Sequence, residues 1–249
     1  MNFHNTYQEH SRASAYNELG FNGTYRLAAD CLPKLLETHV KGNQALDFGS
    51  GTGRSARFLQ KLGFDTIGID ISQTMVDIAR NNDPSGDYRV IQDGDFSSLD
   101  IGSFDLILCA FPFDNIPYYQ KKVRLFTALG DLLAGEGRLV NIVSTPELYV
   151  NEWVTFTTRD FPANRDAGCG DIVNVITKDY SDERPVQDII WPDEDYQAVY
   201  RESGLIQVQS EAPLAKGNEG VDWINETEIA PWRLYVLKKD VLKKDSQVP

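Results

Sequence analysis

The stretch ALDFGSGTGRSARFLQKLGFDTIGIDIS, residues 45–72, is the most informative part of this chain. An apolar run stops at Asp47, and glycines follow at positions 49, 51 and 53. A segment with helical spacing then reaches Gly63, a residue typical of a helix C-terminus, before a second apolar run ends on Asp70. Glycines directly after a strand permit a positive φ or a close approach of the backbone to a ligand. The stretch therefore predicts a strand, a glycine turn, a helix and a second strand.

The alternation of strand and helix continues on both sides of this stretch. Residues 23–39 show the helical spacing of apolar side chains, and Ser72 is the predicted N-cap of a helix that runs to residue 82. Strands are expected over 87–95, 104–111 and 137–144, with a helix over 121–135. A helix over 192–204 and strands over 206–212 and 232–239 follow. Because parallel strands need crossover helices, this order predicts an α/β fold with a doubly wound, seven-stranded, mostly parallel sheet.

The alternation of strands and helices stops after Ser144. Residues 152–161, 171–180 and 184–192 alternate in polarity and are rich in Thr, Val and aromatic residues, which predicts an inserted antiparallel lid. We expect three parts: residues 1–144 with the N-terminal helices and the cofactor-binding half, residues 145–192 as the lid, and residues 193–249 completing the sheet. The lid is expected to complete a substrate pocket.

Composition narrows the classes of partner. The 249 residues carry a net charge of −13 without a basic stripe, so we expect no nucleic-acid substrate. Three widely spaced cysteines, Cys31, Cys109 and Cys169, suggest neither a disulfide framework nor a zinc site, and we expect no metal. No apolar stretch has the length of a membrane span and no leader pattern precedes the first helix, so a cytoplasmic location is expected. The predicted assembly is a monomer or a homodimer.

The glycine spacing separates two kinds of nucleotide site, both of which lie beyond the carboxyl ends of the strands. A nicotinamide enzyme would have a third glycine at position 54, where this chain has Arg54. The spacing is instead Asp47-x-Gly49-x-Gly51-x-Gly53, and LDFGSGTG resembles the first motif of the class I S-adenosylmethionine-dependent methyltransferases. Later segments that resemble this family, DGDF at 93–96, FDLILCAF at 104–111 and LLAGEGRLV at 132–140, follow in the family's order.

The resemblance implies that the chain binds S-adenosylmethionine and releases S-adenosylhomocysteine. Asp70 would accept hydrogen bonds from the two ribose hydroxyls, because a carboxylate has two acceptor oxygens. Ile71 and Met75 would flank the adenine, and Asp95 with Phe96 would contact its other side. The full set of cofactor-binding residues that we predict is Tyr7, Asp47, Gly49, Ser50, Gly51, Gly53, Asp70, Ile71, Ser72, Met75, Gly94, Asp95, Phe96 and Ala110.

The acceptor side is less defined by the sequence. The segment CAFPFDNIPYY, residues 109–119, has Asp114 and Asn115 where related small-molecule methyltransferases often have histidines. Asp114 is a candidate for holding a substrate N–H or accepting a proton, and a simple turn-capping role is equally consistent with the sequence. The N-terminal segment, which in the resembling families folds over the cofactor, adds His10 and Tyr16 as catalytic candidates. Substrate-binding candidates are Arg12, Phe111, Phe113, Tyr118, Trp153 and Trp191.

Taken together, these patterns predict methyl transfer to an N or O atom of a small molecule. DNA amino-methyltransferases carry a polar residue and two prolines at the position of Ala110-Phe111-Pro112-Phe113, and this chain lacks that pattern. A carbon methyltransferase, a non-catalytic S-adenosylmethionine-binding protein and a nicotinamide oxidoreductase remain the alternatives.

Overall fold

The main sheet has the predicted doubly wound arrangement. The computed structural model describes residues 9–178 and 181–240, and within them seven strands pair in the order β3-β2-β1-β4-β5-β10-β9. All neighbours are parallel except β10, which runs antiparallel to β5 and β9. The strands are β1 Gln44–Phe48, β2 Asp65–Asp70, β3 Asp87–Val90, β4 Phe104–Ala110, β5 Leu133–Ser144, β9 Leu205–Glu211 and β10 Trp232–Lys239.

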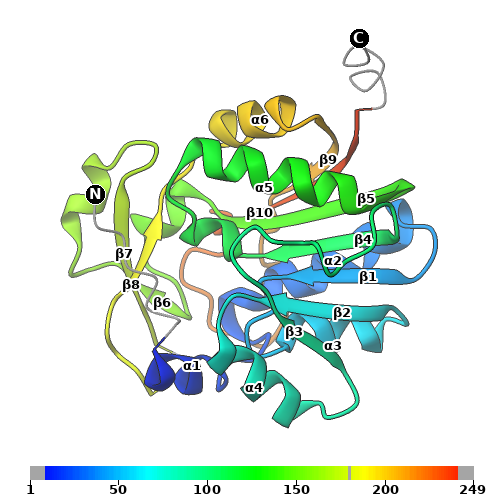
Figure 1. Cartoon of the computed structure of the whole chain (residues 1–249). Helices are drawn as coiled ribbons and strands as arrows, with labels where there is room; N and C mark the ends of the chain where they lie inside the picture. The colour runs from blue at the N-terminus through cyan, green and yellow to red at the C-terminus, as the bar shows by residue number, and fades with distance from the viewer. Residues whose placement is uncertain (1–8, 179–180, 241–249) are drawn as a thin grey trace.

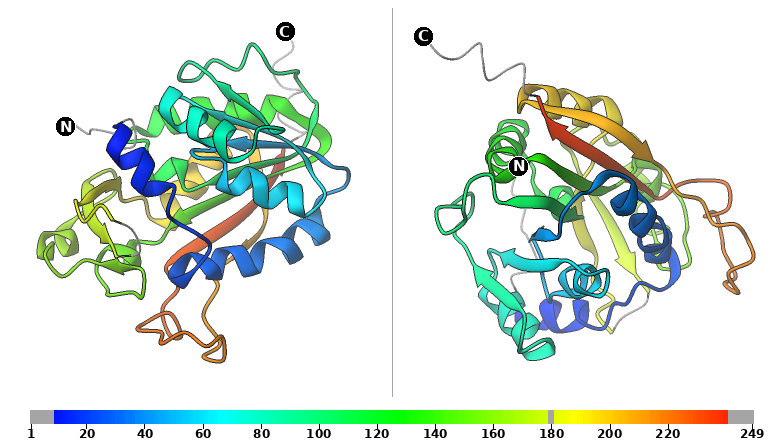
Figure 2. Two further views of the ribbon diagram at one scale, coloured as in Figure 1. Left: turned by 90° about the horizontal axis from the view of Figure 1, so that it is seen from below. Right: turned by 90° about the vertical axis from the view of Figure 1, so that its right-hand side faces the viewer.

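Helices cover both faces of this sheet (Figures 1 and 2). One face carries α2 Arg26–His39, α3 Arg54–Lys61 and α4 Gln73–Asn82, and the other carries α5 Tyr119–Leu132 and α6 Asp193–Glu202. The short helix α1 His10–Tyr16 lies beside α4, at the edge where the lid also sits. Since the crossovers lie on both sides, the sheet is buried on both faces.

Strand β4 shows how the sequence pattern produces an apolar core on each face of the sheet. Leu106 and Leu108 join the cluster that contains the buried leucines of α2, whereas Ile107 and Cys109 join the cluster of α5 and α6. Successive side chains of a strand point to opposite faces, so a continuous apolar run fills both cores at once. This explains why the central strands read as uninterrupted apolar segments.

The inserted segment forms a separate antiparallel sheet. Its strands are β6 Phe156–Thr157, β7 Ile172–Thr177 and β8 Val186–Ile189, in the order β6-β7-β8, between β5 and α6 in the chain. The first strand is much shorter than the predicted 152–161, because the Glu152 side chain accepts the Thr158 N–H and the Thr157 hydroxyl. Side-chain acceptors of this kind compete with strand pairing. The sheet lies beside the main sheet (Figure 1), and residues of all three of its strands line the cavity described below.

Local signals in the quoted stretch are also confirmed. Gly63 has φ 93° just after α3, and the Ser72 hydroxyl accepts the Met75 N–H at 3.3 Å as the N-cap of α4. Strand β3 ends at Val90 instead of residue 95, because the following residues turn, with the Asp95 N–H donating to the Gln92 carbonyl. Within the described residues, no helix combines the length and the apolar character that crossing a bilayer requires.

Candidate active site

The glycine turn lies at the carboxyl end of β1 and is tied to β2. The N–H groups of Gly49 and Ser50 both donate to the Ile69 carbonyl at 2.9 Å. Gly49 has φ 71°, and a Cβ atom there would lie 2.6 Å from the Pro112 Cβ. Only glycine fits this close approach, because any side chain would combine a clash with a left-handed backbone. The turn therefore presents bare backbone at the sheet edge.

Asp70 closes β2 directly beside this turn. Its Oδ2 accepts the Gly51 N–H at 2.9 Å and its Oδ1 accepts the Ser72 N–H at 2.8 Å. Burial raises the pKa of Asp70 above its ordinary value, and the two donated N–H groups oppose that shift. Each carboxylate oxygen has a second lone pair, so the pinned side chain can still accept two hydrogen bonds from a ligand.

Asp47 lies beneath the turn and is fully buried. The Ser55 hydroxyl donates to its Oδ2 at 2.6 Å, while its Oδ1 has no hydrogen-bond partner among the described residues. Burial raises the pKa of Asp47 to about 7, against the lowering effect of the Ser55 hydrogen bond. Asp47 does not line the ligand-sized cavity at this edge, so its side chain supports the turn from behind.

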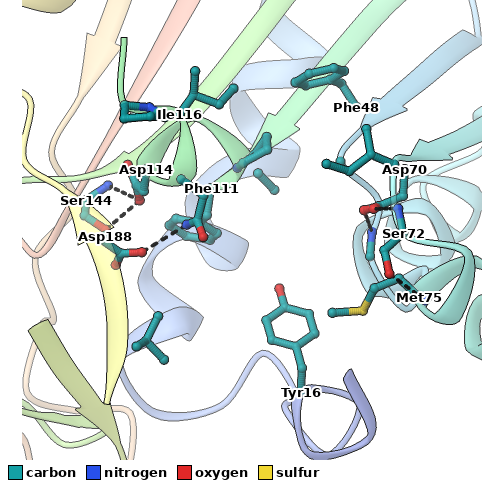
Figure 3. Close-up of a pocket in the computed structure, with 18 of the residues that line it drawn as sticks. Tyr16, Phe48, Asp70, Ser72, Met75, Phe111, Asp114, Ile116, Ser144 and Asp188 are labelled. Carbon is teal, nitrogen blue, oxygen red and sulfur yellow. Dashed lines mark hydrogen bonds between the residues drawn. The ribbon is translucent and has the colours of Figure 1, made fainter. Parts of the chain in front are cut away.

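One cavity of about 480 Å³ connects this turn to the lid. Asp70, Ser72 and Met75 lie at one end, which we call the Asp70 end (Figure 3). Asp114 and Asp188, with Ser144, lie at the other, which we call the Asp114 end. Tyr16 of α1 projects between the two ends. The volume is typical of a site for a small ligand.

Two carboxyl groups face the Asp114 end. Asp114 Oδ2 accepts the Ser144 N–H at 3.0 Å and the Ser144 hydroxyl at 2.7 Å. Asp188 accepts the Asn115 side-chain amide at 3.0 Å and the Tyr149 hydroxyl at 3.2 Å. Burial raises the pKa of both carboxyl groups, and the charge of Asp188 raises that of Asp114 further. This end of the cavity is rich in acceptors.

Lys122 is a buried cation whose charge lowers the pKa of both carboxyl groups. It lies on α5 and is fully buried, with its ammonium 4.8 Å from the centre of the Trp191 ring and donating to the Phe113 carbonyl. Burial lowers the pKa of Lys122 to about 7, against the raising effect of Asp114. Lys122 does not line the cavity, so it stabilises the loop behind Asp114 without reaching a ligand.

Helix α1 is fastened to the lid and to α3. The Arg12 guanidinium, 1% exposed, donates to the Arg184 and Pro185 carbonyls at 3.0 Å. The Arg54 guanidinium donates to the Tyr16 hydroxyl at 3.2 Å and lies 4.7 Å from the Tyr25 ring centre. These contacts hold Tyr16 at the cavity wall.

Many of the predicted site residues meet at this cavity. Those that line it are Tyr16, Gly49, Gly51, Asp70, Ile71, Ser72, Met75, Ala110, Phe111, Asp114 and Tyr118. They come from α1, three strand ends and the loop after β4, which the fold brings to one edge. His10 begins α1, and Tyr7 lies outside the described residues.

Other predicted cofactor residues lie next to the cavity without lining it. Asp47, Ser50 and Gly53 lie beneath or behind the turn. Gly94, Asp95 and Phe96 follow β3, where the Asp95 carboxylate accepts the Ser97 N–H at 3.0 Å and Asp95 is exposed. The neighbouring Asp93 lines the cavity in their place, because the turn after Ile91 directs Asp95 outward.

Four predicted substrate contacts are corrected by the structure, because their side chains lie in the core. Phe113 stacks on Phe126 with ring centres 3.9 Å apart, and the Trp153 indole N–H donates to the Leu148 carbonyl. Trp191 packs against Lys122, and the Arg12 guanidinium donates to the Arg184 carbonyl of the lid. None of the four, Arg12, Phe113, Trp153 and Trp191, lines the cavity.

Sequence reasoning missed Asp188 and the ring of Tyr25, both of which line the cavity. Asp188 lies in β8, whose sequence VQDI places a carboxylate among buried apolar residues. A buried charge in an apolar strand was the available signal, because such a group is retained only when something pairs with it.

Comparison with known proteins agrees with this geometry. Residues 46–140, from β1 into β5, match the family described as a methyltransferase domain. This segment is a methyltransferase domain. The ubiquinone biosynthesis O-methyltransferase of Coxiella burnetii (strain Dugway 5J108-111) is 29% identical over 93 residues, which cover 36% of this chain and 40% of that protein. The chain thus spans about two fifths of that relative's length.

Solved structures extend the likeness over nearly the whole fold. The CcbJ methyltransferase from Streptomyces caelestis superposes with a TM-score of 0.65 at 15% identity, covering 95% of this chain and 99% of that chain. An S-adenosylmethionine-dependent methyltransferase from Clostridium acetobutylicum ATCC 824 gives a TM-score of 0.59 at 16% identity, covering 86% and 92%. The methyltransferase domain and the surrounding elements therefore have the class I S-adenosylmethionine-dependent methyltransferase fold.

Proposed function

We propose that this chain transfers a methyl group from S-adenosylmethionine to an N or O atom of a small molecule. The observation that carries the proposal is the Asp70 end of the cavity, where a bare glycine turn and a pinned carboxylate meet. The acceptor oxygens of Asp70 beside this turn suit a nucleoside with two free ribose hydroxyls and no pyrophosphate. The methyltransferase domain that contains this end supports the same conclusion.

The residues present fit the cofactor on two observations. Asp70 retains two lone pairs, and a Cβ at Gly51 would lie 3.5 Å from Tyr16 and 3.9 Å from Met75. Asp70 would hold the ribose, and Met75 with Ile71 would border the adenine. When bound, S-adenosylmethionine supplies an electrophilic methyl group.

The protein's contribution is mainly positioning and exclusion of water. Tyr16 and the fastened α1 enclose the middle of the cavity, and the lid encloses the acceptor. Asp114 is available to accept a proton from the acceptor atom. The cavity volume suits a small molecule, and the name of the Coxiella burnetii relative, a small-molecule O-methyltransferase, supports that substrate class.

Calorimetry with S-adenosylhomocysteine and NADH tests the cofactor assignment. We expect binding of S-adenosylhomocysteine and none of NADH, because the turn has no third glycine for a pyrophosphate. Binding of NADH alone would make the chain a nicotinamide enzyme. Release of S-adenosylhomocysteine with a panel of small N and O nucleophiles then tests transfer, and binding without release on any of them would leave a non-catalytic binding protein.

A further inference from the structure

The Asp114 end of the cavity has a polarity that selects among acceptors. We propose that the acceptor is a small-molecule amine, with its nitrogen held by Asp114 and Asn115 beside the charge of Asp188. This inference rests on the proposed methyl transfer and names the chemical class of the acceptor. It uses side chains from η3 Pro112–Asn115 and β8, together with the aromatic wall of the same cavity.

The two carboxyl groups are buried yet open to the cavity. Asp114 is 4% exposed and Asp188 is 7% exposed, and both line the cavity wall. Neither forms an ion pair with a Lys, Arg or His among residues 9–178 and 181–240. Burying these carboxyl groups is costly, and the charge of Lys122 behind Asp114 offsets only part of that cost, because the pKa of both groups is still raised. A cationic ligand in the cavity would offset more of it.

The hydrogen-bonding positions that Asp114 and Asn115 leave open are acceptors. Asp114 Oδ2 already receives both donors of Ser144, which leaves Oδ1 for a ligand. The Asn115 amide N–H is directed to Asp188, and its Oδ1 is buried without a hydrogen-bond partner in the described part of the chain. A primary ammonium has three N–H donors, whereas a hydroxyl has one. The surplus of acceptors therefore favours an amine over an alcohol.

The rest of this end is aromatic, which is the second and independent observation. Tyr25, Phe111, Phe156 and Trp232 line the cavity and pack on one another, with the Phe111 and Trp232 ring centres 4.8 Å apart. Such a wall excludes water and accepts the hydrocarbon part of a ligand. In a poorly hydrated site the attraction between carboxylate and ammonium is stronger than in water, and ring faces next to a cation add to it.

The chemical step balances with these groups alone plus the methyl donor. An ammonium has no lone pair, so it first gives one proton to the Asp114 carboxylate, which becomes a carboxylic acid. The neutral nitrogen then uses its lone pair to form the N–C bond to the methyl carbon. The S–C bond breaks with its electron pair left on sulfur, which gives S-adenosylhomocysteine and a methylammonium product. Asp114 returns its proton to solvent when the product leaves.

Paired probes test this assignment on the full chain with saturating S-adenosylmethionine. Benzylamine and cyclohexylamine are compared with benzyl alcohol and cyclohexanol at equal millimolar concentration, and released S-adenosylhomocysteine is measured. Binding of the same four probes is measured by calorimetry with S-adenosylhomocysteine present. We expect binding or methylation of at least one amine and neither for its matched alcohol.

Variants connect the preference to the named side chains. Asp114→Asn is expected to lower kcat/KM for the amine by about 10²-fold or more, the scale of a lost proton acceptor. Asp188→Asn should reduce the ratio of amine to alcohol binding, a readout that a merely structural residue would not change. If either variant does not fold, Asn115→Leu replaces it, because Asn115 is half-buried and the substitution removes the free acceptor. Asp160→Asn, an exposed residue of the lid, is the matched control.

The outcomes separate this inference from the proposed function. Methylation of an alcohol and not its amine, or binding of S-adenosylhomocysteine with no binding and no turnover of either amine, overturns the amine assignment and leaves cofactor binding intact. An Asp114→Asn variant as active on the amine as the wild type overturns the assignment of Asp114 as the group that holds and deprotonates the nitrogen. Absence of S-adenosylhomocysteine binding in the folded wild-type protein overturns the proposed function itself.

Discussion

At the scale of single residues, Asp70 shows how a strand end becomes a binding group. Its two oxygens are held by the Gly51 and Ser72 N–H groups, one from the glycine turn and one from the start of α4. The carboxylate is therefore oriented before any ligand arrives, and little side-chain entropy is lost on binding. Pre-orientation of this kind explains why an acidic residue ends this strand.

Replacing Asp70 with Asn tests that role. The variant loses the charge and one acceptor oxygen, so we expect the Kd of S-adenosylhomocysteine to rise by roughly 10- to 100-fold, or about 1.5–3 kcal/mol. Calorimetry gives the constants, and Asp65→Asn at the opposite end of β2 is the control, because Asp65 is exposed and distant from the cavity. Equal affinity in the Asp70 variant and the wild type would contradict the assignment.

At the scale of elements, α1 and the lid form the part of the site whose position depends on long-range contacts. Helix α1 has only 7 residues, too few to be stable by itself, so its position depends on tertiary contacts. Arg12 supplies the main contact: besides its hydrogen bonds to two carbonyls, it pairs with Asp182 at 3.4 Å. Tyr16, at the end of the same helix, lines the cavity. Enclosure of the cavity thus depends on a buried arginine.

Replacing Arg12 with Met should release α1 from the lid. The two carbonyls would lose their donor and Asp182 would keep only Arg184 in the described part of the chain, so we expect a loss of about 1–3 kcal/mol in the free energy of unfolding. Hydrogen exchange in residues 10–16 should become faster, and S-adenosylhomocysteine should bind more weakly. Arg159→Met, on an exposed lid residue with a single ion pair at 3.8 Å, is the control. Unchanged exchange in α1 would mean that Arg12 does not hold the helix.

At the scale of the whole molecule, the buried carboxyl groups determine whether the free energy of unfolding rises or falls with pH. The pKa of Asp47 is raised to about 7, and burial also raises those of Asp114 and Asp188. The folded chain then binds more protons than the unfolded chain, whose aspartates titrate near about 4. Stability of the ligand-free protein should therefore fall as pH rises from about 4 to about 7.

Thermal unfolding at constant ionic strength measures this effect. We expect a higher Tm at pH 5 than at pH 7.5 for the wild type, and a smaller difference for Asp47→Asn, which has no proton to lose. The share of Asp47 is of order 3 kcal/mol over this range. Asp65→Asn, on the exposed side of β2, should keep the wild-type difference. An Asp47 variant with the same pH dependence as the wild type would show that Asp47 ionises without cost.

The order of the elements was predictable, because it depends on patterns within short windows. Uninterrupted apolar runs such as β4 indicate buried parallel strands, and Gly63 and Ser72 mark helix ends by local hydrogen bonding. The lid was predictable in kind, but not in the length of β6, where Glu152 competes for the backbone. Trp153 and Phe113 were predicted to contact substrate but lie in the core, since aromatic content does not say which way a side chain points.

The sequence by itself determined the Asp70 end of the site. Strand, glycine turn, helix and acidic strand end all lie within residues 45–72, so their geometry follows from local backbone chemistry and one parallel pairing. Only the tertiary structure decided the Asp114 end. Asp114 meets Ser144 across 30 residues, and Asn115 meets Asp188 across 73. The first contact depends on the pairing of β4 with β5, and the second depends on how the lid packs against η3. No local propensity encodes either arrangement.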